Sequence, residues 1–152
     1  MLGRIFGDPA MMQYVGQVET PEQVRQRHRR YLTGDNDILR MFAILAGPQE
    51  QAAGLIGFWE HDAQGKPVYE MGWCVLPEFQ GKGIATRAAL LAVELVRREH
   101  KFRHLHAYAA VDNVPSNAVC RKAGFELLGQ VVVDSPPAPQ VPYNDWSIDL
   151  GE

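Results

Sequence analysis

The most constraining feature of this sequence is a change of hydrophobic period on either side of Gly83. Residues 68–76 form a short run rich in β-branched and aromatic side chains, which predicts a strand. After Gly83 the apolar residues recur at the spacing of one helix face, which predicts an α-helix of about four turns. The apolar positions of that face are Ile84, Ala88, Leu91 and Leu95. The chain is therefore expected to pass from a sheet directly into a helix through a tight glycine turn.

The remaining pattern predicts a mixed α+β domain. Besides the long helix, we expect helices at residues 9–16, 21–34 and 115–123. We expect strands at residues 41–45, 55–59, 68–76, 103–111, 125–133 and 143–150, with a stiff proline connector at 136–139. We expect the first three strands to pair in order as an antiparallel meander. A chain of 152 residues, 46% hydrophobic and 22% charged, suits one domain, which we expect to span residues 1–152.

The composition argues against a nucleic-acid partner, a membrane span and secretion. The formal net charge is −3, so the broad positive field of a nucleic-acid-binding protein is missing, and we expect no nucleic-acid partner. The longest apolar run, at residues 88–96, contains Glu94 and is too short to cross a membrane. Residues 1–10 lack the pattern of a secretory signal. Cys74 and Cys120 have no metal-ligand or disulfide spacing, so we expect free thiols, no metal and a cytoplasmic location.

The glycine turn at residues 80–85 has the features of a phosphate-binding loop. Its glycines let the backbone approach a ligand, and the first amides of the following helix have no partners inside that helix. With the positive end of the helix dipole and the nearby Lys82, these amides suit a pyrophosphate group. Ile84 argues against the P-loop of nucleoside triphosphatases, and Thr86 stands where a dinucleotide-binding turn needs a third glycine. The alternative is a strand–helix turn that binds nothing.

Two motifs resemble those of the Gcn5-related N-acetyltransferase (GNAT) superfamily. Residues 80–85 resemble its Q/R-x-x-G-x-G/A acetyl-CoA loop, and residues 69–78 look like the strand that precedes the loop. Residues 113–125 are similar to the N-x-x-S-x-x-V-x-x-K-x-G-F run of the ribosomal-protein alanine/serine N-acetyltransferase (RimJ/RimL-like) branch. The resemblance covers roughly residues 40–133 and is faint before them.

This resemblance implies a single-domain fold with a mixed, mostly antiparallel sheet flanked by helices, and an acetyl-CoA-binding core at about residues 68–126. Its central strands, which carry Trp73 and Tyr108, are expected to splay apart and admit the pantetheine arm of the coenzyme. A backbone N–H near Val75 would bind the acetyl carbonyl. The coenzyme-binding residues that the resemblance implies are Cys74, Val75, Leu76, Gln80, Gly81, Lys82, Gly83, Ile84, Ala85, Thr86, Asn113 and Ser116.

The implied reaction is direct attack of an amine on the acetyl thioester in a ternary complex. Glu70 lies where some members of the superfamily place a general base, although a surface carboxylate is an equal alternative. His104 and His106 on the next strand are candidate substitute bases, with a half-buried strand residue as the alternative for each. Ser116 and Cys120 lie on one face of a short helix. We favour Ser116 as the proton donor to the leaving thiolate, with Cys120, where many relatives carry tyrosine, as the second candidate. The alternatives are that Ser116 only satisfies a backbone amide at the helix N-terminus and that Cys120 is a buried, inert thiol.

The expected function is acetyl transfer from acetyl-CoA to a primary amine of a peptide N-terminus or a small molecule. An antibiotic or polyamine acetyltransferase of the same fold is one alternative. A non-catalytic CoA-binding sensor is another. The partners are therefore acetyl-CoA and an amine acceptor, with no membrane, and a homodimer stays open.

The acceptor-binding residues are the least determined by the sequence. Phe58 and Trp59 face opposite sides of a strand, so at most one of them lines a pocket. Residues 2–6 leave room for at most a short first strand. The second predicted helix carries a group of arginines that are spread over all of its sides. This distribution predicts a solvated surface rather than an acceptor site. Its members are Arg25, Arg27, Arg29 and Arg30.

Overall fold

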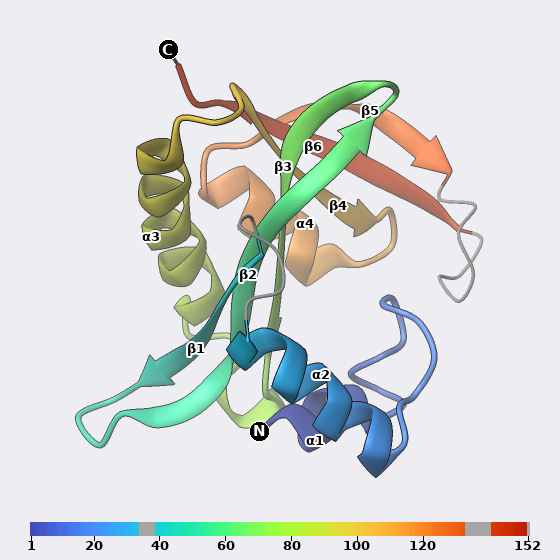
Figure 1. Ribbon diagram of the computed structural model, residues 1–152, viewed down its shortest axis with the longest axis vertical. Helices are drawn as coiled ribbons and strands as arrows, with labels where there is room; N and C mark the ends of the chain where they lie inside the picture. The colour runs from blue at the N-terminus through green and yellow to red at the C-terminus, as the bar shows by residue number, and fades with distance from the viewer. Residues whose placement is uncertain (34–38, 133–140, 152) are drawn as a thin grey trace.

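Among the residues that the structure describes, six strands form one sheet, and helices cover both of its faces (Figure 1). The computed structural model describes residues 1–33, 39–132 and 141–151. The strands are β1 (Arg40–Ala46), β2 (Gln51–Ala63), β3 (Lys66–Val75), β4 (His104–Ala110), β5 (Glu126–Val132) and β6 (Pro142–Asp149). The helices are α1 (Leu2–Phe6), α2 (Pro21–Thr33), α3 (Ile84–Glu99) and α4 (Val114–Lys122), with a 3₁₀ turn, η1, at Pro77–Phe79. The α+β class is confirmed, and so is the predicted order of elements from α2 onward.

The strands β1, β2 and β3 form the predicted antiparallel meander. Its turns are tighter than the sequence predicted, occupying only residues 47–50 and 64–65. Residues 51–54 and 61–63, which were expected in loops, extend β2 because they keep pairing with β1 and β3. The long β2–β3 hairpin therefore carries side chains well beyond the apolar core.

The junction of β3 and β4 is parallel, unlike every other pairing described in the sheet, and it is very short. Tyr69 pairs with Leu105 and Glu70 pairs with His106, and no further pairing joins the two strands. Both strands continue for several residues beyond these pairs. Their carboxyl-terminal halves therefore diverge, and the predicted splay of the central strands is confirmed.

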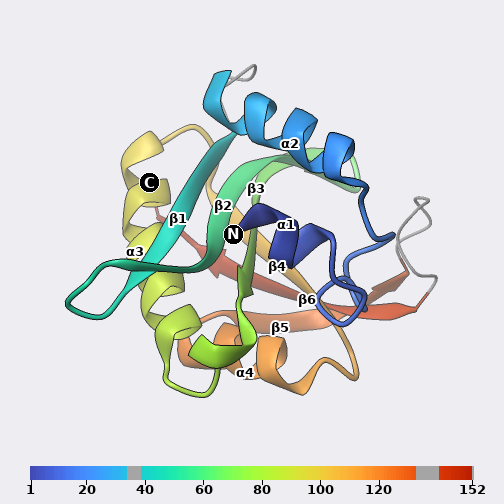
Figure 2. The same ribbon diagram turned by 90° about the horizontal axis from the view of Figure 1, so that it is seen from below.

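Two apolar clusters hold helices to opposite faces of the sheet. The larger cluster packs α3 and α4 against one face and includes Val96, Cys120 and Tyr69. The smaller cluster joins α1 and α2 to the other face, with Ile5 and Leu76 among its buried members. Figure 2 shows α2 lying across one side of the sheet and α3 and α4 on the other. The gap between β3 and β4 is therefore bordered by different helices on its two faces.

The predicted apolar stripe of α3 is only partly confirmed, because Ile84 and Ala88 pack against the larger apolar cluster but a neighbouring face is the buried one. Its buried residues are Ala89, Ala92, Val93 and Val96. Ala89 and Ala92 are small, so turning them inward lets the helix lie close to the sheet at the density of a protein interior. Leu91 is 70% exposed, and it lines an apolar groove of about 420 Å³ with Leu95 and Phe42 of β1. The predicted core-facing stripe is therefore wrong at Leu91 and Leu95.

The N-terminal segment also departs from the prediction. A helix occupies Leu2–Phe6, where the sequence left room for a short strand, and residues 9–15 form turns instead of a helix. Asp8 starts these turns, because its Oδ1 accepts the Ala10 N–H at 2.8 Å. A short acidic side chain that bonds the local backbone competes with a continuous helix. Met12 then packs into the smaller apolar cluster.

Some predicted features lie outside the described residues. They are the helix end at Gly34, the strand end at Val133 and the proline connector at residues 136–139. A single domain across residues 1–152 stays a prediction. Within the described ranges, no helix is long and apolar enough to cross a membrane.

The buried face of α3 predicts how two truncations differ in stability. Val96→Ala is expected to lower the free energy of unfolding by about 2 kcal/mol, because Val96 is fully buried and its truncation leaves a cavity. Leu91→Ala removes a larger side chain, yet it should change that free energy by less than about 0.5 kcal/mol, because Leu91 is exposed. Urea unfolding followed by circular dichroism measures both changes. A larger loss for Leu91→Ala than for Val96→Ala would contradict this packing.

Candidate active site

The gap between β3 and β4 leaves one edge of β3 without a partner strand. The Leu76 N–H donates to Ala53 O of β2 at 2.8 Å. Backbone groups of successive strand residues point to alternate sides, so those of Val75 and Trp73 point away from β2 and toward the gap. Beyond its short junction with β3, β4 does not pair with these groups. A ligand whose amides are spaced like those of a peptide can pair with such a free edge.

The glycine turn opens at the end of β3, as the sequence predicted. Gly81 and Gly83 have φ angles of 72° and 73°, in the left-handed region. A Cβ on either residue would meet no atom within 4 Å, so backbone conformation and not lack of space requires glycine here. The first hydrogen bond of α3 runs from the Arg87 N–H to Gly83 O at 3.1 Å. The amides of the first turn therefore have no partners inside the helix, and residues 81–83 are exposed.

Polar contacts hold this loop against the end of β3. Gln80 Nε2 donates to Val75 O at 2.8 Å, and Lys82 Nζ donates to Glu78 O at 2.9 Å. Arg4 of α1 donates to both carboxylate oxygens of Glu78, at 2.7 and 2.9 Å. The contacts of Arg4 and Lys82 are exposed, so they add little stability, whereas the Gln80 bond is partly buried. They do fix the direction in which the loop leaves the strand.

The predicted coenzyme-binding residues fall into distinct places. Residues 80–86 form the loop and the first turn of α3. Cys74, Asn113 and Ser116 line the cavity described below. Leu76 is engaged elsewhere: its N–H bonds to β2, its carbonyl accepts the Phe79 N–H at 2.9 Å, and its side chain is buried in the smaller apolar cluster. Leu76 therefore holds the turn in place.

Two asparagines fix the helix that carries Ser116. Asn113 Oδ1 accepts the Ser116 N–H at 3.3 Å and caps α4, which leaves the Asn113 Nδ2 for a ligand. The buried Asn117 donates from Nδ2 to Ala110 O at 2.9 Å and accepts from Trp146 Nε1 at 2.9 Å. These bonds tie α4 to β4 and β6. Ser116 is thereby held at the wall of the cavity.

Both cysteines are free thiols, as predicted. Cys120 has no exposed surface and packs in the larger apolar cluster, where burial raises its pKa to about 12. Cys74 lies at the cavity wall, and burial raises its pKa to about 11. Of the two acids predicted on α4, Ser116 reaches the cavity, whereas Cys120 is enclosed by apolar side chains.

A cavity of about 1450 Å³ lies on the α1–α2 side of the sheet. Trp59 lines it, whereas Phe58 is buried in the larger apolar cluster, so the prediction that at most one of them lines a pocket is confirmed. Trp73 of the splayed strand and Ser116 of α4 also belong to its wall. The cavity therefore extends to the gap between β3 and β4.

Two histidine–carboxylate pairs lie at the apex of this gap. His61 Nδ1 is 3.0 Å from Glu70 Oε2, and His106 Nδ1 is 2.7 Å from Asp145 Oδ1. Glu70 and His106 form the last pair of the β3–β4 junction, so the two pairs are neighbours. The Tyr108 ring contacts both imidazoles, with centroid distances of 5.3 Å to His61 and 6.0 Å to His106. We call these five residues the histidine–carboxylate cluster.

Burial governs the acidity of groups in this cluster. It raises the pKa of Glu70 above its ordinary value, and the effects of His61 and Trp59, which lower that pKa, offset it only in part. Burial and the negative charges of Asp145 and Glu70 likewise raise the pKa of Tyr108. A carboxylate with a raised pKa accepts a proton more readily near neutral pH. Glu70 therefore lies at the site and not on a solvated face of its strand.

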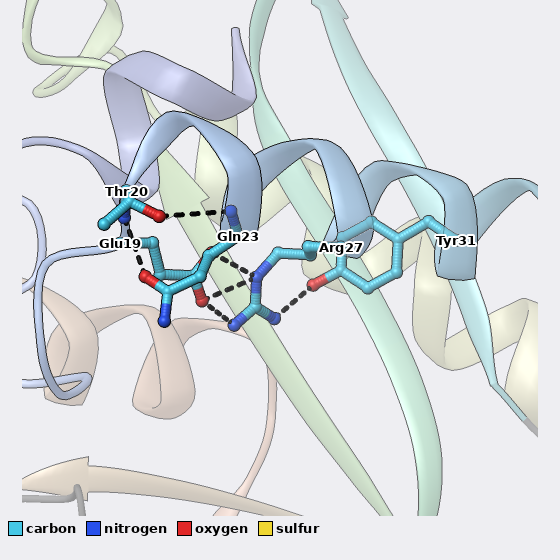
Figure 3. Close-up of polar contacts among 5 residues, drawn as sticks. All are labelled: Glu19, Thr20, Gln23, Arg27 and Tyr31. Carbon is cyan, nitrogen blue, oxygen red and sulfur yellow. Dashed lines mark hydrogen bonds and ion pairs between the residues drawn. The ribbon is translucent and has the colours of Figure 1, made fainter.

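Arg27 forms part of the helical wall of the cavity. Figure 3 shows its polar contacts with Glu19 and Tyr31. Its Nε donates to Glu19 Oε1 at 3.0 Å, its Nη1 donates to the Tyr31 hydroxyl at 2.9 Å, and its guanidinium lies 4.1 Å from the centroid of the Phe6 ring. Its side chain is only 24% exposed. The predicted solvated surface is therefore wrong for Arg27, because its partners come from α1 and from the segment before α2. Arg25 is exposed, as predicted.

A capping box fixes the start of α2 and thereby the position of Arg27 (Figure 3). Thr20 Oγ1 accepts the Gln23 N–H at 3.3 Å, and Gln23 Oε1 accepts the Thr20 N–H at 2.8 Å. Glu19 immediately precedes this cap and pairs with Arg27. The wall of the cavity is therefore anchored where the helix begins.

The sequence analysis missed His61 and Asp145. His61 falls in a segment that was predicted to be a turn, so its place on a strand was not recognised. Asp145 lies 39 residues from His106 and on a different strand, so no local spacing connects the two. The alternation of Tyr143, Asp145 and Ser147 along one strand was the available signal that Asp145 shares a face with other polar groups.

The sequence and the fold match known acetyltransferases. The family model described as acetyltransferase (GNAT) domain matches residues 1–126, and the chain therefore belongs to the GNAT family of acetyltransferases. It is 27% identical over 122 residues to the uncharacterized N-acetyltransferase YnaD of Bacillus subtilis (strain 168), covering 80% of this chain and 69% of that protein. The predicted superfamily is thus confirmed.

Two solved structures show how widely this fold is shared. Spermidine N-acetyltransferase from Vibrio cholerae, in complex with CoA and spermine, has a TM-score of 0.80 at 17% identity, covering 98% of this chain and 88% of that one. RimL, the ribosomal L7/L12 α-N-protein acetyltransferase in complex with CoA, has a TM-score of 0.76 at 21% identity, covering 97% and 85%. Since enzymes named for a polyamine and for a ribosomal protein share the fold, the fold alone does not determine the acceptor.

The conformation of the loop predicts that Gly83→Val lowers the affinity for CoA. A β-branched residue at a φ of 73° displaces the loop amides, so we expect a rise in Kd of at least about tenfold in calorimetry. Gly47→Val is the matched control, since Gly47 also has a φ of 73° and open space around it but lies in the β1–β2 turn. The control should lose roughly 1–2 kcal/mol of stability and keep normal affinity. Normal affinity in Gly83→Val would remove the phosphate role from this loop.

Proposed function

We propose that this GNAT protein transfers the acetyl group of acetyl-CoA to a primary amine. The observation that carries the proposal is the two-residue junction of β3 and β4. It leaves a free strand edge beside the glycine loop and a cavity lined by the partly buried carboxylates of Glu70 and Asp145 on the other face of the sheet. One ligand can therefore enter from each face, and the two can meet at the apex of the gap.

The residues present fit acetyl-CoA, which would supply an activated acetyl thioester when bound. The free amides of the loop and of the first turn of α3 suit its pyrophosphate. The backbone N–H and carbonyl of Trp73 that face the gap suit the amides of its pantetheine arm, while the Val75 carbonyl already accepts from Gln80. The Val75 N–H would donate to the acetyl carbonyl oxygen, where negative charge develops during transfer.

The amine would enter through the cavity on the α1–α2 side. The carboxylate of Glu70 and the rings of Trp59 and Tyr108 line this cavity and suit an ammonium group. Only the neutral amine can attack, and an α-amine of pKa ~8 is mostly protonated at neutral pH. The amine must therefore lose a proton at the site, and Glu70, the base predicted from the sequence, belongs to the cluster that would receive it.

Ser116 is our candidate for the acid that protonates the leaving thiolate. It lies at the cavity wall on a helix that Asn113 and Asn117 hold in place. Cys120, one helical turn later, is enclosed and has a pKa of about 12. A packing role suits Cys120 better than proton transfer.

A panel of amines tests the proposed function. The purified protein is mixed with acetyl-CoA and, separately, with peptides beginning in Ala or Ser, with spermidine and with an aminoglycoside. We expect free thiol to appear with at least one amine, together with an equal amount of acetylated product by mass spectrometry. Binding of CoA without thiol release from any amine would overturn the proposal and support the non-catalytic sensor.

Ser116→Ala tests the proposed acid. We expect kcat to fall at least about tenfold, because the thiolate then leaves without a positioned donor, while the Kd of CoA stays within about twofold. Val114→Ala is the matched control on the same helix, because Val114 is exposed. Steady-state kinetics and calorimetry give the two quantities. Normal turnover in Ser116→Ala would assign the proton transfer to water.

A further inference from the structure

The histidine–carboxylate cluster contains two groups able to accept a proton from an amine, Glu70 and His106. Their surroundings differ. Glu70 Oε2 lies 3.0 Å from His61 Nδ1, so one oxygen of this carboxylate is already paired with an imidazole nitrogen. In His106, by contrast, Nδ1 pairs with Asp145. The other ring nitrogen, Nε2, takes no part in this pair. The two groups are therefore suited to different tasks.

Asp145 determines which nitrogen of His106 can act as a base. Nδ1 lies 2.7 Å from a carboxylate oxygen, so the neutral ring carries its hydrogen on Nδ1 and donates it to Asp145. In the described part of the chain Nε2 has no hydrogen-bond partner, yet no buried side-chain nitrogen or oxygen there is left unpaired. Nε2 therefore reaches solvent, and His106 lines the cavity. Nε2 is therefore the ring nitrogen of His106 that is left to accept a proton from a ligand in the cavity.

The surrounding strands hold this pair rigidly. His106 is 7% exposed, and its ring stacks on Tyr108 at an interplanar angle of 26°. Asp145 sits opposite Tyr108 in the β4–β6 ladder, which is paired along its whole length. A base and its orienting carboxylate on two paired strands keep their geometry better than groups carried on a loop.

We propose that His106, positioned by Asp145, accepts the proton of the acceptor amine, and that Glu70 with His61 binds the amine in its ammonium form. This proposal rests on the proposed acetyl transfer. The Asp145 carboxylate stabilises the imidazolium ion that forms, the arrangement known from other histidine bases. Glu70, Trp59 and Tyr108 hold the ammonium group before it reacts.

The protons and bonds of this step balance. The ammonium nitrogen gives one proton to His106 Nε2, and its freed electron pair forms the N–C bond to the acetyl carbon. The C–S bond breaks, and the second nitrogen-bound proton reaches the thiolate through Ser116. The imidazolium then returns its proton to water in the cavity. One ammonium ion and one thioester thus give one amide, one thiol and one proton.

Several titratable groups face His106 and shape its pH dependence. They are His61 on β2, Glu70 on β3, His104 and Tyr108 on β4, and Asp145 on β6. Of these, Asp145 makes the hydrogen bond to the ring. With a base in place, the rate should level off below the pKa of the free amine. Without it, only amine that is already neutral in solution can react.

Three variants separate the two tasks in steady-state kinetics. His106→Gln should lower kcat about 100-fold and change the KM of the amine by less than about threefold. The rate of this variant should keep rising with pH toward the pKa of the free amine, because the variant lacks the base. Glu70→Gln should mainly raise that KM, by about tenfold. His28→Gln, on the exposed surface of α2, is the matched control and should behave as wild type. Calorimetry with CoA checks that each variant is folded.

Asp145→Asn tests the positioning role with a readout that does not depend on turnover. Long-range ¹⁵N spectra of the histidine rings should show that the neutral His106 ring of the wild type carries its hydrogen on Nδ1. In Asp145→Asn this ring should no longer hold a single tautomer, and kcat should fall at least about tenfold. A wild-type ring protonated on Nε2, or His106→Gln with normal kcat and pH profile, would overturn the proposal while thiol release persists. Absence of thiol release from wild type with every amine would instead overturn the proposed function.

Discussion

The short parallel junction of β3 and β4 is the constraint on which the other features of this protein depend. Two parallel strands need a crossover connection, and here α3 supplies it across one face of the sheet. Because α3 begins directly after the glycine turn, its unpaired amides lie at the open end of the gap. The glycine loop, the free edge of β3 and the apex at Glu70 and His106 therefore all follow from one topological arrangement.

The cavity on the α1–α2 side depends instead on the cost of burying titratable side chains and on the partners that offset this cost. Burying several titratable side chains at the apex is unfavourable unless each has a partner. The pairing of His61 with Glu70 and of His106 with Asp145 meets that requirement and leaves polar groups facing the cavity. On the helical side, Arg27 is held in the same way by Glu19 and the Phe6 ring. Ion pairs and hydrogen bonds between distant segments thus hold the polar side chains that line the cavity.

Features with a local cause were predictable from the sequence. The glycine loop follows from the left-handed conformation at Gly81 and Gly83, and the order of strands and helices follows from hydrophobic period. The buried face of α3 was predicted only in part, because the apolar residues on that helix outnumber those that fit beneath it, and close packing selects Ala89 and Ala92 over Leu91. The places of Ser116 at the cavity and Cys120 in the core likewise depended on how α4 meets the sheet.

The sequence by itself determined the α+β class, the strand–glycine–helix unit and the superfamily, because each depends on patterns of residues that lie close together along the chain. Only the tertiary structure decided which polar groups meet at the apex of the gap. Asp145 and His61 reach it from β6 and β2 through strand pairing, and the register of a ladder is set by packing across the whole sheet. No local pattern contains that register, so the partner of each histidine could be assigned only once the sheet was assembled.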